Sequence, residues 1–249
     1  MVYIRDSRLI QLYIWHNAVK NLLKMNNIKN KRKIVQFSPM RSGSTLIANI
    51  LRDIFPGLTV RKTHDLRSLS RKIHLHILKF PVVSTYRYPL DIIASELKVN
   101  NLEPTAKAIE ESCQILERNG IKELSKVKNN KNVLLLKYEN FYGNLDFIFN
   151  EFEIFFGIDI NEQTRIQLKS DYSIDNIKKI TDNLSPDQFI DKNLASATGG
   201  DGVFHGKHVS NTKGMPGSYK SFFNEEQIEW LRYRFSDFIK EFGYSDNKI

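Results

Sequence analysis

The chain has 249 residues, of which 41% are hydrophobic and 26% are charged. This length suits one large α/β domain. The apolar share is enough for a packed core, which excludes an intrinsically disordered chain. Lysine and arginine exceed aspartate and glutamate by 37 to 28, giving a formal net charge of +9. Such an excess favours a polyanionic partner, namely a nucleic acid, an anionic membrane or a phosphate-rich ligand.

The sequence also bears on the cellular compartment. Cys113 is the only cysteine, so an internal disulfide is impossible, which agrees with a reducing compartment. No apolar run approaches the length of a membrane span. The first residues carry Arg5, Asp6 and Arg8 before any apolar stretch, and no small-residue cleavage site follows, so no secretory signal is expected. These features predict a cytoplasmic protein without a transmembrane segment.

The chain is predicted to form one domain over residues 1–249. Residues 3–25 place apolar side chains at helical spacing with lysines on the other side, which predicts an amphipathic helix that docks on the domain. A polar and basic stretch follows, so residues 1–32 are expected to be an N-terminal helix and basic linker. Residues 33–181 are expected to form the core.

A strand, a tight loop and a helix are predicted at the start of this core. The apolar run 34–37 predicts a buried strand, and the spacing of apolar residues from Leu46 to Ile54 predicts a helix. The loop between them carries Arg41, Ser42, Gly43, Ser44 and Thr45. Unpaired N–H groups at a helix start bind phosphate, helped here by a glycine, hydroxyls and a guanidinium. A capped helix after a turn is the alternative.

Further strands alternate with helices along the core. Residues 58–60, 81–86 and 132–136 predict strands, whereas 66–81 is open between a short helix and a strand. Helices are predicted after Pro89 and at residues 104–117, 145–156 and 161–170. Because the strands are continuously apolar, we expect a central parallel sheet with helices on both faces.

The predicted strands end in residues suited to one anionic ligand. In a parallel sheet ligands bind at the carboxyl ends of the strands. The basic or aromatic residues at these ends are Arg41, Lys62, His64, Arg87 and Tyr138. We therefore expect a single anion-binding site along this edge.

The last part of the chain changes in composition. Residues 182–223 are rich in Asn, Asp, Ser, Gly and Lys, and predict a mobile loop that covers the substrate or nucleotide, or else a disordered connector. Residues 224–249 are expected to form a C-terminal helix. Asn224 with Gln227 three residues later fits its N-cap.

Several segments, in order, resemble motifs of the sulfotransferases that use 3′-phosphoadenosine 5′-phosphosulfate (PAPS). They are residues 39–45 (the 5′-phosphosulfate loop), 62–64 (Lys-Thr-His), 86–91 with Ser95 (the 3′-phosphate motif), 137–139 (the stretch near the adenine) and 212–220 (the late segment that closes over the nucleotide). The resemblance spans residues 34–225. It implies the P-loop-NTPase-like sulfotransferase fold: a single α/β domain with a central parallel sheet flanked by helices.

The resemblance also implies roles for individual residues. His64 would be the catalytic base, Lys62 would contact the transferring sulfuryl group, and Arg41 would neutralise charge on the leaving phosphate. The implied nucleotide-binding residues are Arg41, Ser42, Gly43, Ser44, Thr45, Arg87, Ser95, Tyr138, Thr212, Lys213 and Gly214. The chain departs from the pattern at Leu46, where a Trp is frequent, and at Thr212, where the family has an Arg. Adenine stacking and 3′-phosphate contacts are therefore expected to differ.

These residues predict an enzyme of EC 2.8.2 type. It would move a sulfuryl group from PAPS to a hydroxyl or amine of a small-molecule, glycan or lipid acceptor and release 3′-phosphoadenosine 5′-phosphate (PAP). The scheme requires no metal and no nucleic-acid partner. Rival bases are His205 and His208, and the alternative for His64 is a partly buried histidine bonded to a carbonyl. His74 and His76 lack a third metal ligand at matching spacing.

Three rival functions remain open at this point. A nucleotide-dependent phosphotransferase with an atypical phosphate loop would need Mg²⁺ ligands, for which Asp53 and Asp65 are candidates. A basic nucleic-acid-binding protein would use a basic stripe with interleaved aromatics, such as residues 230–234, although we expect these aromatics to pack in the core. A member of the family that binds nucleotide without catalysis is the third. The acceptor and the oligomeric state are not predicted.

Overall fold

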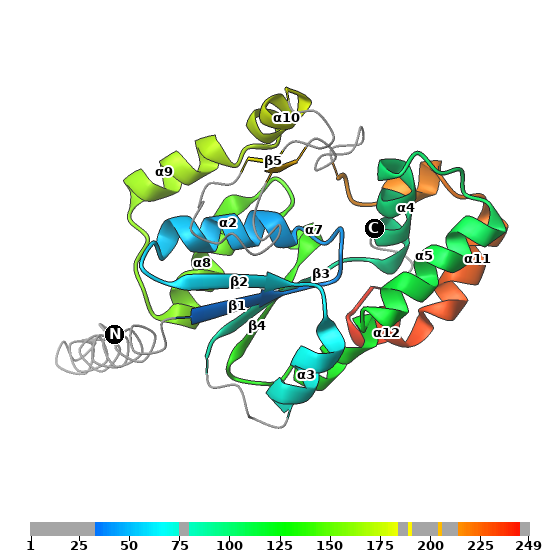
Figure 1. Ribbon diagram of the computed structural model, residues 1–249, viewed down its shortest axis with the longest axis horizontal. Helices are drawn as coiled ribbons and strands as arrows, with labels where there is room; N and C mark the ends of the chain where they lie inside the picture. Colours follow the sequence, from blue (N-terminus) through cyan, green and yellow to red (C-terminus); the bar gives the residue numbers. More distant parts are fainter. Residues whose placement is uncertain (1–32, 75–79, 184–188, 191–203, 206–213, 245–249) are drawn as a thin grey trace, which may run out of the picture.

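Four parallel strands form the central sheet of the computed structural model, which describes residues 33–74, 80–183, 189–190, 204–205 and 214–244. They are β1 (Lys33–Phe37), β2 (Thr59–Thr63), β3 (Val82–Tyr86) and β4 (Val133–Lys137), in the order β2-β1-β3-β4 (Figure 1). The predicted parallel sheet is confirmed. The second strand runs further than predicted, so that Lys62 lies within it, opposite Gln36 of β1.

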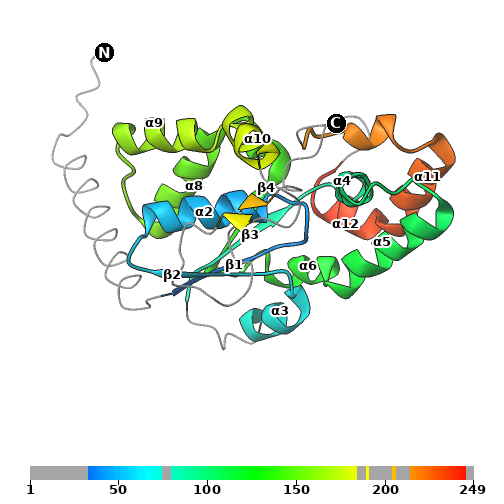
Figure 2. The ribbon, with the colours of Figure 1, turned by 45° about the horizontal axis from the view of Figure 1, so that its top comes forward.

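Helices cover both faces of the sheet, as the continuously apolar strands predict (Figure 2). On one face lie α2 (Ser44–Ile54), α7 (Tyr138–Phe141), α8 (Leu145–Phe156), α9 (Glu162–Asp171) and α10 (Ile174–Asp182). On the other lie α3 (Leu66–His74), α4 (Pro89–Val99), α5 (Ala106–Arg118), η1 (Ile121–Glu123), α6 (Leu124–Val127), α11 (Glu225–Arg234) and α12 (Ser236–Glu241). Alternate residues of a strand point to opposite faces of the sheet. In β1, Val35 and Phe37 pack against the face covered by α4 and α5, and Ile34 packs against the face covered by α2 and α8.

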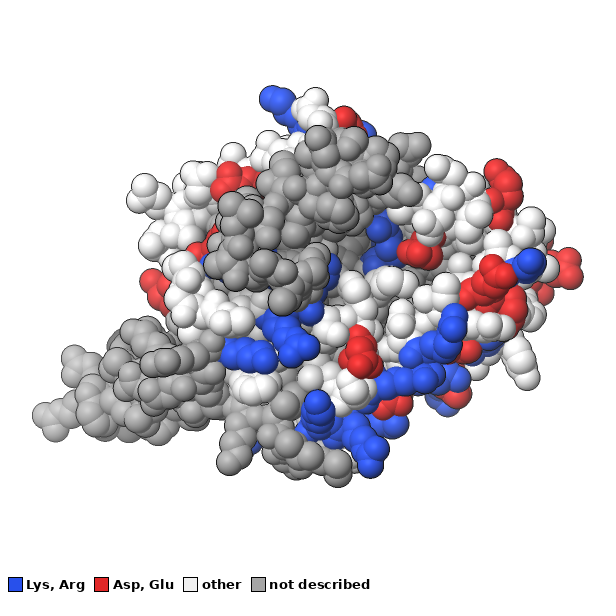
Figure 3. Space-filling view, viewed as in Figure 1, with Lys and Arg blue, Asp and Glu red and all other residues white. Residues whose placement is uncertain are grey.

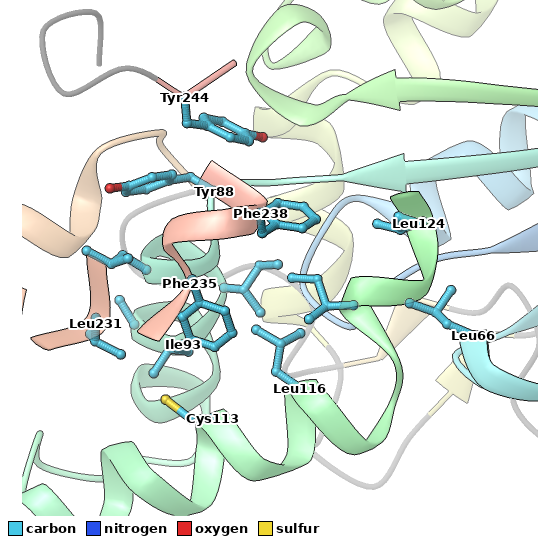
Figure 4. Close-up of a cluster of buried hydrophobic side chains, with 14 of the residues drawn as sticks. Leu66, Tyr88, Ile93, Cys113, Leu116, Leu124, Leu231, Phe235, Phe238 and Tyr244 are labelled. Atoms are coloured by element: carbon cyan, nitrogen blue, oxygen red, sulfur yellow. The ribbon is translucent and has the colours of Figure 1, made fainter. Parts of the chain in front are cut away.

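Cys113 belongs to the core on the α5 face. Figure 4 shows its sulfur among the side chains of Ile93, Leu116 and Phe235. Burial raises the pKa of the thiol to about 12, so the sulfur stays protonated at neutral pH. The side chain is therefore a packing group rather than a nucleophile.

Most predicted helices appear at their expected positions. The helix α8 has the predicted bounds, and α5 and α9 begin and end within two residues of them. The ambiguous segment after residue 66 is helical through His74. The helix α10 was not predicted. Residues 1–32, with the predicted N-terminal helix, and His76 lie outside the described residues.

The C-terminal part differs from the single helix predicted for residues 224–249. Helix α11 begins with the predicted capping box between Asn224 and Gln227, but it ends at Arg234, and α12 begins at Ser236 after the single residue Phe235. Phe235 leaves helical backbone angles (φ −106°, ψ 18°) and is 1% exposed. The break therefore lets the rings of both Phe235 and Phe238 enter the core.

The aromatic residues of α11 do not pack as predicted. Trp230 and Tyr233 are 41% and 83% exposed. The buried face of α11 is narrow and centres on Leu231, while the Trp230 ring lies under the guanidinium of Arg234 at 5.1 Å. The expectation that these aromatics belong to the core was wrong.

Within the segment predicted as a long covering loop, the described parts are ordered. The strands β5 (Phe189–Ile190) and β6 (Phe204–His205) pair antiparallel, and the short helix η2 (Ser218–Ser221) packs on α4. Among the described helices, none combines the length and apolarity that a membrane crossing requires.

Candidate functional site

The carboxyl ends of the four strands open into one pocket of about 730 Å³. Its lining includes every strand-end residue predicted for the anionic site: Arg41, Lys62, His64, Arg87 and Tyr138. Gly43, Ser44, Thr45, Ser95 and Gly214 line it too. Thr212, Lys213 and His208 lie outside the described residues, and the structure gives no side-chain position for His205. The predicted convergence on a single edge of the sheet is therefore confirmed for the described residues.

The β1–α2 loop (residues 38–43) leads to the N-terminus of α2, which no side chain of the described residues caps; we call it the open helix start. Gly43 adopts φ 83° and immediately precedes α2. The first turn of α2, which the structure describes in full, holds no acidic residue. The first-turn residues Ser44, Thr45 and Leu46 line the pocket. Their backbone N–H groups and the positive end of the helix dipole make this helix start suitable for a phosphate or sulfate.

Gly43 is held where a larger residue does not fit. A Cβ at this position would lie 2.9 Å from Cζ of Phe141 and 3.1 Å from Cδ2 of Tyr138, and the positive φ disfavours any side chain. We expect Gly43→Ala to lower the free energy of unfolding by about 1–3 kcal/mol. Urea denaturation measures this change.

The matched control for that substitution is Gly57→Ala. A Cβ at Gly57 would meet nothing within 4 Å, and its backbone lies outside the positive-φ region. Its unfolding free energy should stay within about 0.5 kcal/mol of the parent value. Equal effects for the two variants would show that the close approach at Gly43 is not required.

Ser42 turns inward rather than toward the pocket. Its side chain is fully buried, and Oγ bonds to the carbonyl of Pro39 at 2.6 Å and to Oγ1 of Thr85 at 2.8 Å. Residue 42 can therefore reach a ligand only through its main chain. Its neighbour Arg41 has φ 60°, an uncommon conformation for a residue with a side chain.

His64, just beyond β2, has one ring nitrogen committed and one available. Nδ1 lies 2.8 Å from the carbonyl oxygen of Ser38. A carbonyl only accepts, so Nδ1 carries the hydrogen, and in the neutral ring Nε2 keeps its lone pair. Burial, followed by the positive charge of Lys62, lowers the pKa of His64. The carbonyl bond considered as the alternative is present, and it leaves the imidazole able to accept a proton.

Lys62 lies in β2, two residues before His64. Its Nζ donates to Oγ1 of Thr45, at the start of α2, over 2.7 Å. This bond places an ammonium group beside the open helix start. A transferring anionic group at that point would meet the helix N–H groups and Lys62 together.

Arg41 points along the pocket toward α4. Its Nε donates to Oγ of Ser95 over 3.2 Å. Burial lowers the pKa of Arg41; Glu96 opposes this effect and Arg87 adds to it. A guanidinium stays charged even so. Two partly desolvated cations, Arg41 and Arg87, thus lie near each other, an arrangement that an anion would stabilise.

Arg87, after β3, is 2% exposed. Its guanidinium donates to the carbonyls of Arg41, Gly214 and Met215 over 3.1, 3.0 and 3.4 Å. It also lies over the ring of Tyr138, 4.3 Å from the centroid. Arg87 therefore braces the β1–α2 loop against the segment that begins at Gly214.

The ionic partner of Arg87 is Asp91, which was not among the predicted site residues. It is fully buried, 4.0 Å from Nη2 of Arg87. Its carboxylate accepts from the backbone N–H groups of Gly217 and Tyr219, at 2.7 and 3.1 Å, and from the hydroxyl of Ser218 at 3.3 Å. Asp91 thus fixes the segment after Gly214 to α4.

Tyr138 closes the floor of the pocket between two glycines. Its hydroxyl donates to the carbonyl of Gly214 over 2.9 Å, and burial raises its pKa to about 12. A Cβ at Gly214 would lie 2.5 Å from this hydroxyl, so only glycine fits there without a shift. Tyr138 is thereby an organising residue of the site.

Apolar side chains also line the pocket, namely Leu46, Phe141, Tyr142, Leu145, Ile174 and Ile177. We call this set the apolar wall; Asn144, Asp146, Lys169 and Ser173 line the pocket beside it. The residues of the apolar wall come from α2, from the end of α7, the turn that follows it and the start of α8, and from α10. The pocket thus combines cationic side chains with an apolar wall, as a site for a ligand with anionic and apolar parts would require.

The candidate Mg²⁺ ligands of the phosphotransferase alternative are engaged elsewhere. Asp53 accepts from the hydroxyl of Tyr172, and Asp65 accepts from the backbone N–H of Ser68 at the start of α3. Neither lines the pocket. In the described ranges, no group of three His, Cys, Asp or Glu side chains could hold a metal ion.

The surface charge is mixed on the face that Figure 3 shows. Lys and Arg side chains gather over α3, but Asp and Glu lie among the basic side chains near α5. The Trp230–Arg234 pair of α11 is accompanied by acidic partners, since Arg234 bonds to Glu117 at 3.0 Å. These features do not favour a continuous basic stripe on this face.

Comparisons with known proteins agree with the fold. The structure is similar to mouse sulfotransferase SULT7A1 complexed with PAP, with a TM-score of 0.58 and 16% identity over 84% of each chain. It is also similar to retinol dehydratase with androsterone and inactive cofactor PAP (TM-score 0.58, 13% identity, 92% of this chain and 86% of that chain) and with retinol and PAP (0.55, 15%, 92% and 87%). No family model matches the sequence, and no curated protein matches it. The chain has the sulfotransferase fold, which confirms the predicted fold class.

Proposed function

We propose that the protein is a PAPS-dependent sulfotransferase of EC 2.8.2 type, which transfers a sulfuryl group to an acceptor hydroxyl or amine and releases PAP. One observation carries the proposal: an open helix start, Lys62 and a histidine with a free Nε2 line the same pocket. The sulfotransferase fold and the PAP held by the similar structures support it. The single cysteine supports a cytoplasmic location.

The nucleotide would lie along the length of the pocket. The 5′-phosphosulfate would rest on the backbone N–H groups of Gly43, Ser44 and Thr45. The 3′-phosphate would bind between Ser95, Arg41 and the wall formed by Arg87. Nε of Arg87 is buried without a partner among the described residues, which supports an anion nearby. The adenine would pack on the apolar wall, where Leu46 takes the place of the expected Trp.

The segment 182–223 would cover the bound nucleotide, with Thr212 and Lys213 contributing to the site. Its described end supports this role, because Gly214 lines the pocket and the residues after it are held by Asp91. A small-molecule, glycan or lipid alcohol would enter beside His64.

The transfer would need a base, a charge stabiliser and an aligned acceptor. Nε2 of His64 would take the proton of the acceptor hydroxyl as its oxygen bonds to sulfur. The bond from sulfur to the bridging oxygen of the 5′-phosphate would break, and its electron pair would stay on PAP. Lys62 and the α2 N–H groups would stabilise the charge on the sulfuryl and bridging oxygens. No step of this scheme uses a metal.

The acidity of His64 predicts how activity depends on pH. The neutral imidazole is the active form, and its pKa lies below the usual 6.5. More than half of His64 is therefore neutral at pH 6.5, and activity falls only as the pH drops through the lowered pKa. We expect an NMR titration of the free protein to place the His64 midpoint below 6.5. A midpoint at or above 6.5 would contradict the electrostatic description of the site.

Calorimetric titration tests the proposed function. PAP should bind without Mg²⁺, and ATP should bind at least tenfold more weakly because it lacks the 3′-phosphate. This factor corresponds to about 1.4 kcal/mol, close to the contribution of one weak charged hydrogen bond, about 1.5 kcal/mol. Labelled PAPS should then pass its label to one member of a panel of phenols, sugars, lipid alcohols and amines. Preference for ATP with Mg²⁺ would instead favour the phosphotransferase alternative.

A further inference from the structure

A buried cluster of hydroxyl groups lies beneath the β1–α2 loop. Ser38, Ser42 and Thr85 are each fully buried. Oγ1 of Thr85 lies 2.8 Å from Oγ of Ser38 and 2.8 Å from Oγ of Ser42. Nε2 of Gln36 also donates to Oγ of Ser38, over 2.6 Å. The hydroxyl of Thr85 is therefore the one that joins the two serines.

The two serines stand at opposite ends of the loop. Ser38 begins it, and Ser42 lies next to its last residue. Between them Arg41 holds φ 60°, a conformation that persists only where the surroundings enforce it. Because Thr85 bonds to both serines, it ties the loop to β3 on either side of Arg41.

The same cluster reaches the proposed base. The carbonyl of Ser38 accepts the Nδ1 hydrogen of His64 over 2.8 Å. The side chain of that serine bonds to the backbone N–H of Thr85 and to its hydroxyl, both at 2.8 Å. The position of the carbonyl, and with it the tautomer of His64, thus depends on β3.

We propose that the hydroxyl of Thr85 is a positioning group that sets both the shape of the β1–α2 loop and the tautomer of His64. The two structural effects, on the loop and on the tautomer, do not depend on the proposed function. Only their consequence for catalysis rests on it. Thr85 is fully buried and is not among the residues that line the pocket. Its role is to place the anion-binding loop and the base at a fixed distance from each other.

The neighbouring residue in β3 offers a matched control. Ser84 is also fully buried, but its hydroxyl has no hydrogen-bond partner among the described residues. Substituting Ser84 with Ala removes a buried hydroxyl from the same strand without touching the loop. Thr85→Val removes the hydroxyl of Thr85 at nearly constant volume, and Thr85→Ser keeps it.

The first test reads the tautomer of His64 by ¹⁵N NMR of the imidazole in the free protein. The parent protein, Ser84→Ala and Thr85→Ser should show hydrogen on Nδ1. Thr85→Val should shift a measurable fraction of the hydrogen to Nε2, because Ser38, whose carbonyl holds the Nδ1 hydrogen, loses its bond to the Thr85 hydroxyl. Hydrogen on Nε2 in the parent protein, or an unchanged tautomer in a folded Thr85→Val variant, would overturn the inference.

The second test titrates the same proteins with PAP. Loss of the Thr85 hydroxyl should weaken PAP binding about tenfold, while Ser84→Ala and Thr85→Ser stay within about threefold of the parent. If the parent does not bind PAP, the proposed function fails, and the NMR result still decides the inference. If the parent binds PAP and Thr85→Val binds it equally, the loop does not depend on Thr85 and the inference fails alone.

Discussion

Substituting His64 with Ala is expected to lower kcat for sulfuryl transfer by about 10²–10⁴-fold, the usual contribution of a general base. The physical reason is the orientation of the ring. Nδ1 donates to the carbonyl of Ser38, so Nε2 is the only basic atom that His64 can offer to an acceptor hydroxyl. PAP affinity should change little, since the imidazole is not among the groups proposed to hold the phosphates. Transfer from labelled PAPS and calorimetric titration with PAP measure the two effects.

His74 provides the matched control for this prediction. Its Nδ1 also lies near a carbonyl, that of Lys126 at 3.4 Å, but it is exposed at the end of α3 and does not line the pocket. The His74→Ala variant should transfer at the parent rate. Full activity in His64→Ala would remove the assigned base, and an equal loss in both variants would indicate a general effect of losing a histidine.

Substituting Arg87 with Met is expected to lower the free energy of unfolding by about 3–5 kcal/mol, the range for breaking a buried ion pair. The substitution keeps much of the side-chain volume but removes the donors to the Arg41 and Gly214 carbonyls. It also leaves Asp91 buried without its nearest cation. Urea denaturation measures the change, and PAP binding should be lost with it because the β1–α2 loop is no longer braced.

Arg71→Met is the matched control for this substitution. Arg71 is exposed on α3, so its replacement should change the unfolding free energy by less than about 0.5 kcal/mol. A loss below about 1 kcal/mol for Arg87→Met would show that Arg87 does not brace the loop. In that case the role implied by the resemblance, direct 3′-phosphate binding, would be its main one.

The arrangement of the sheet could be predicted from local sequence because three of its four strands, β1, β3 and β4, are short and mainly apolar. Residues 34–37 and 132–136 have the composition of buried strands, and parallel strands necessarily bring their carboxyl ends to one edge. The positions of Lys62, His64 and Arg87 followed from that rule. The predicted bounds of α8, residues 145–156, match the structure, in which Asn144 caps the helix.

The remaining parts of the site depend on contacts distant in sequence. Ser42 has the residue type of a ligand, yet its partner Thr85, 43 residues away, turns its hydroxyl inward. Asp91 is a carboxylate on the buried face of α4, but its partners at residues 217–219 could not be identified from spacing. The apolar wall on α10 carried no motif, since Ile174 and Ile177 resemble ordinary core residues.

The side chain of Arg41 does not lie where the resemblance implies. The resemblance places Arg41 at the leaving phosphate, whereas its side chain bonds to Ser95. We propose that Arg41 serves the 3′-phosphate, where Thr212 replaces the expected arginine. Lys62, bonded to Thr45, would then carry more of the charge stabilisation at the sulfuryl group.

A crystal structure of the protein with PAP tests the central claim most directly. The account predicts the 5′-phosphate within hydrogen-bond distance of the backbone N–H groups of Ser44 and Thr45, and the 3′-phosphate beside Ser95 and Arg41. It predicts the adenine against the apolar wall near Leu46. PAP bound away from the β1–α2 loop, or a pocket that remains empty at saturating PAP, would contradict it.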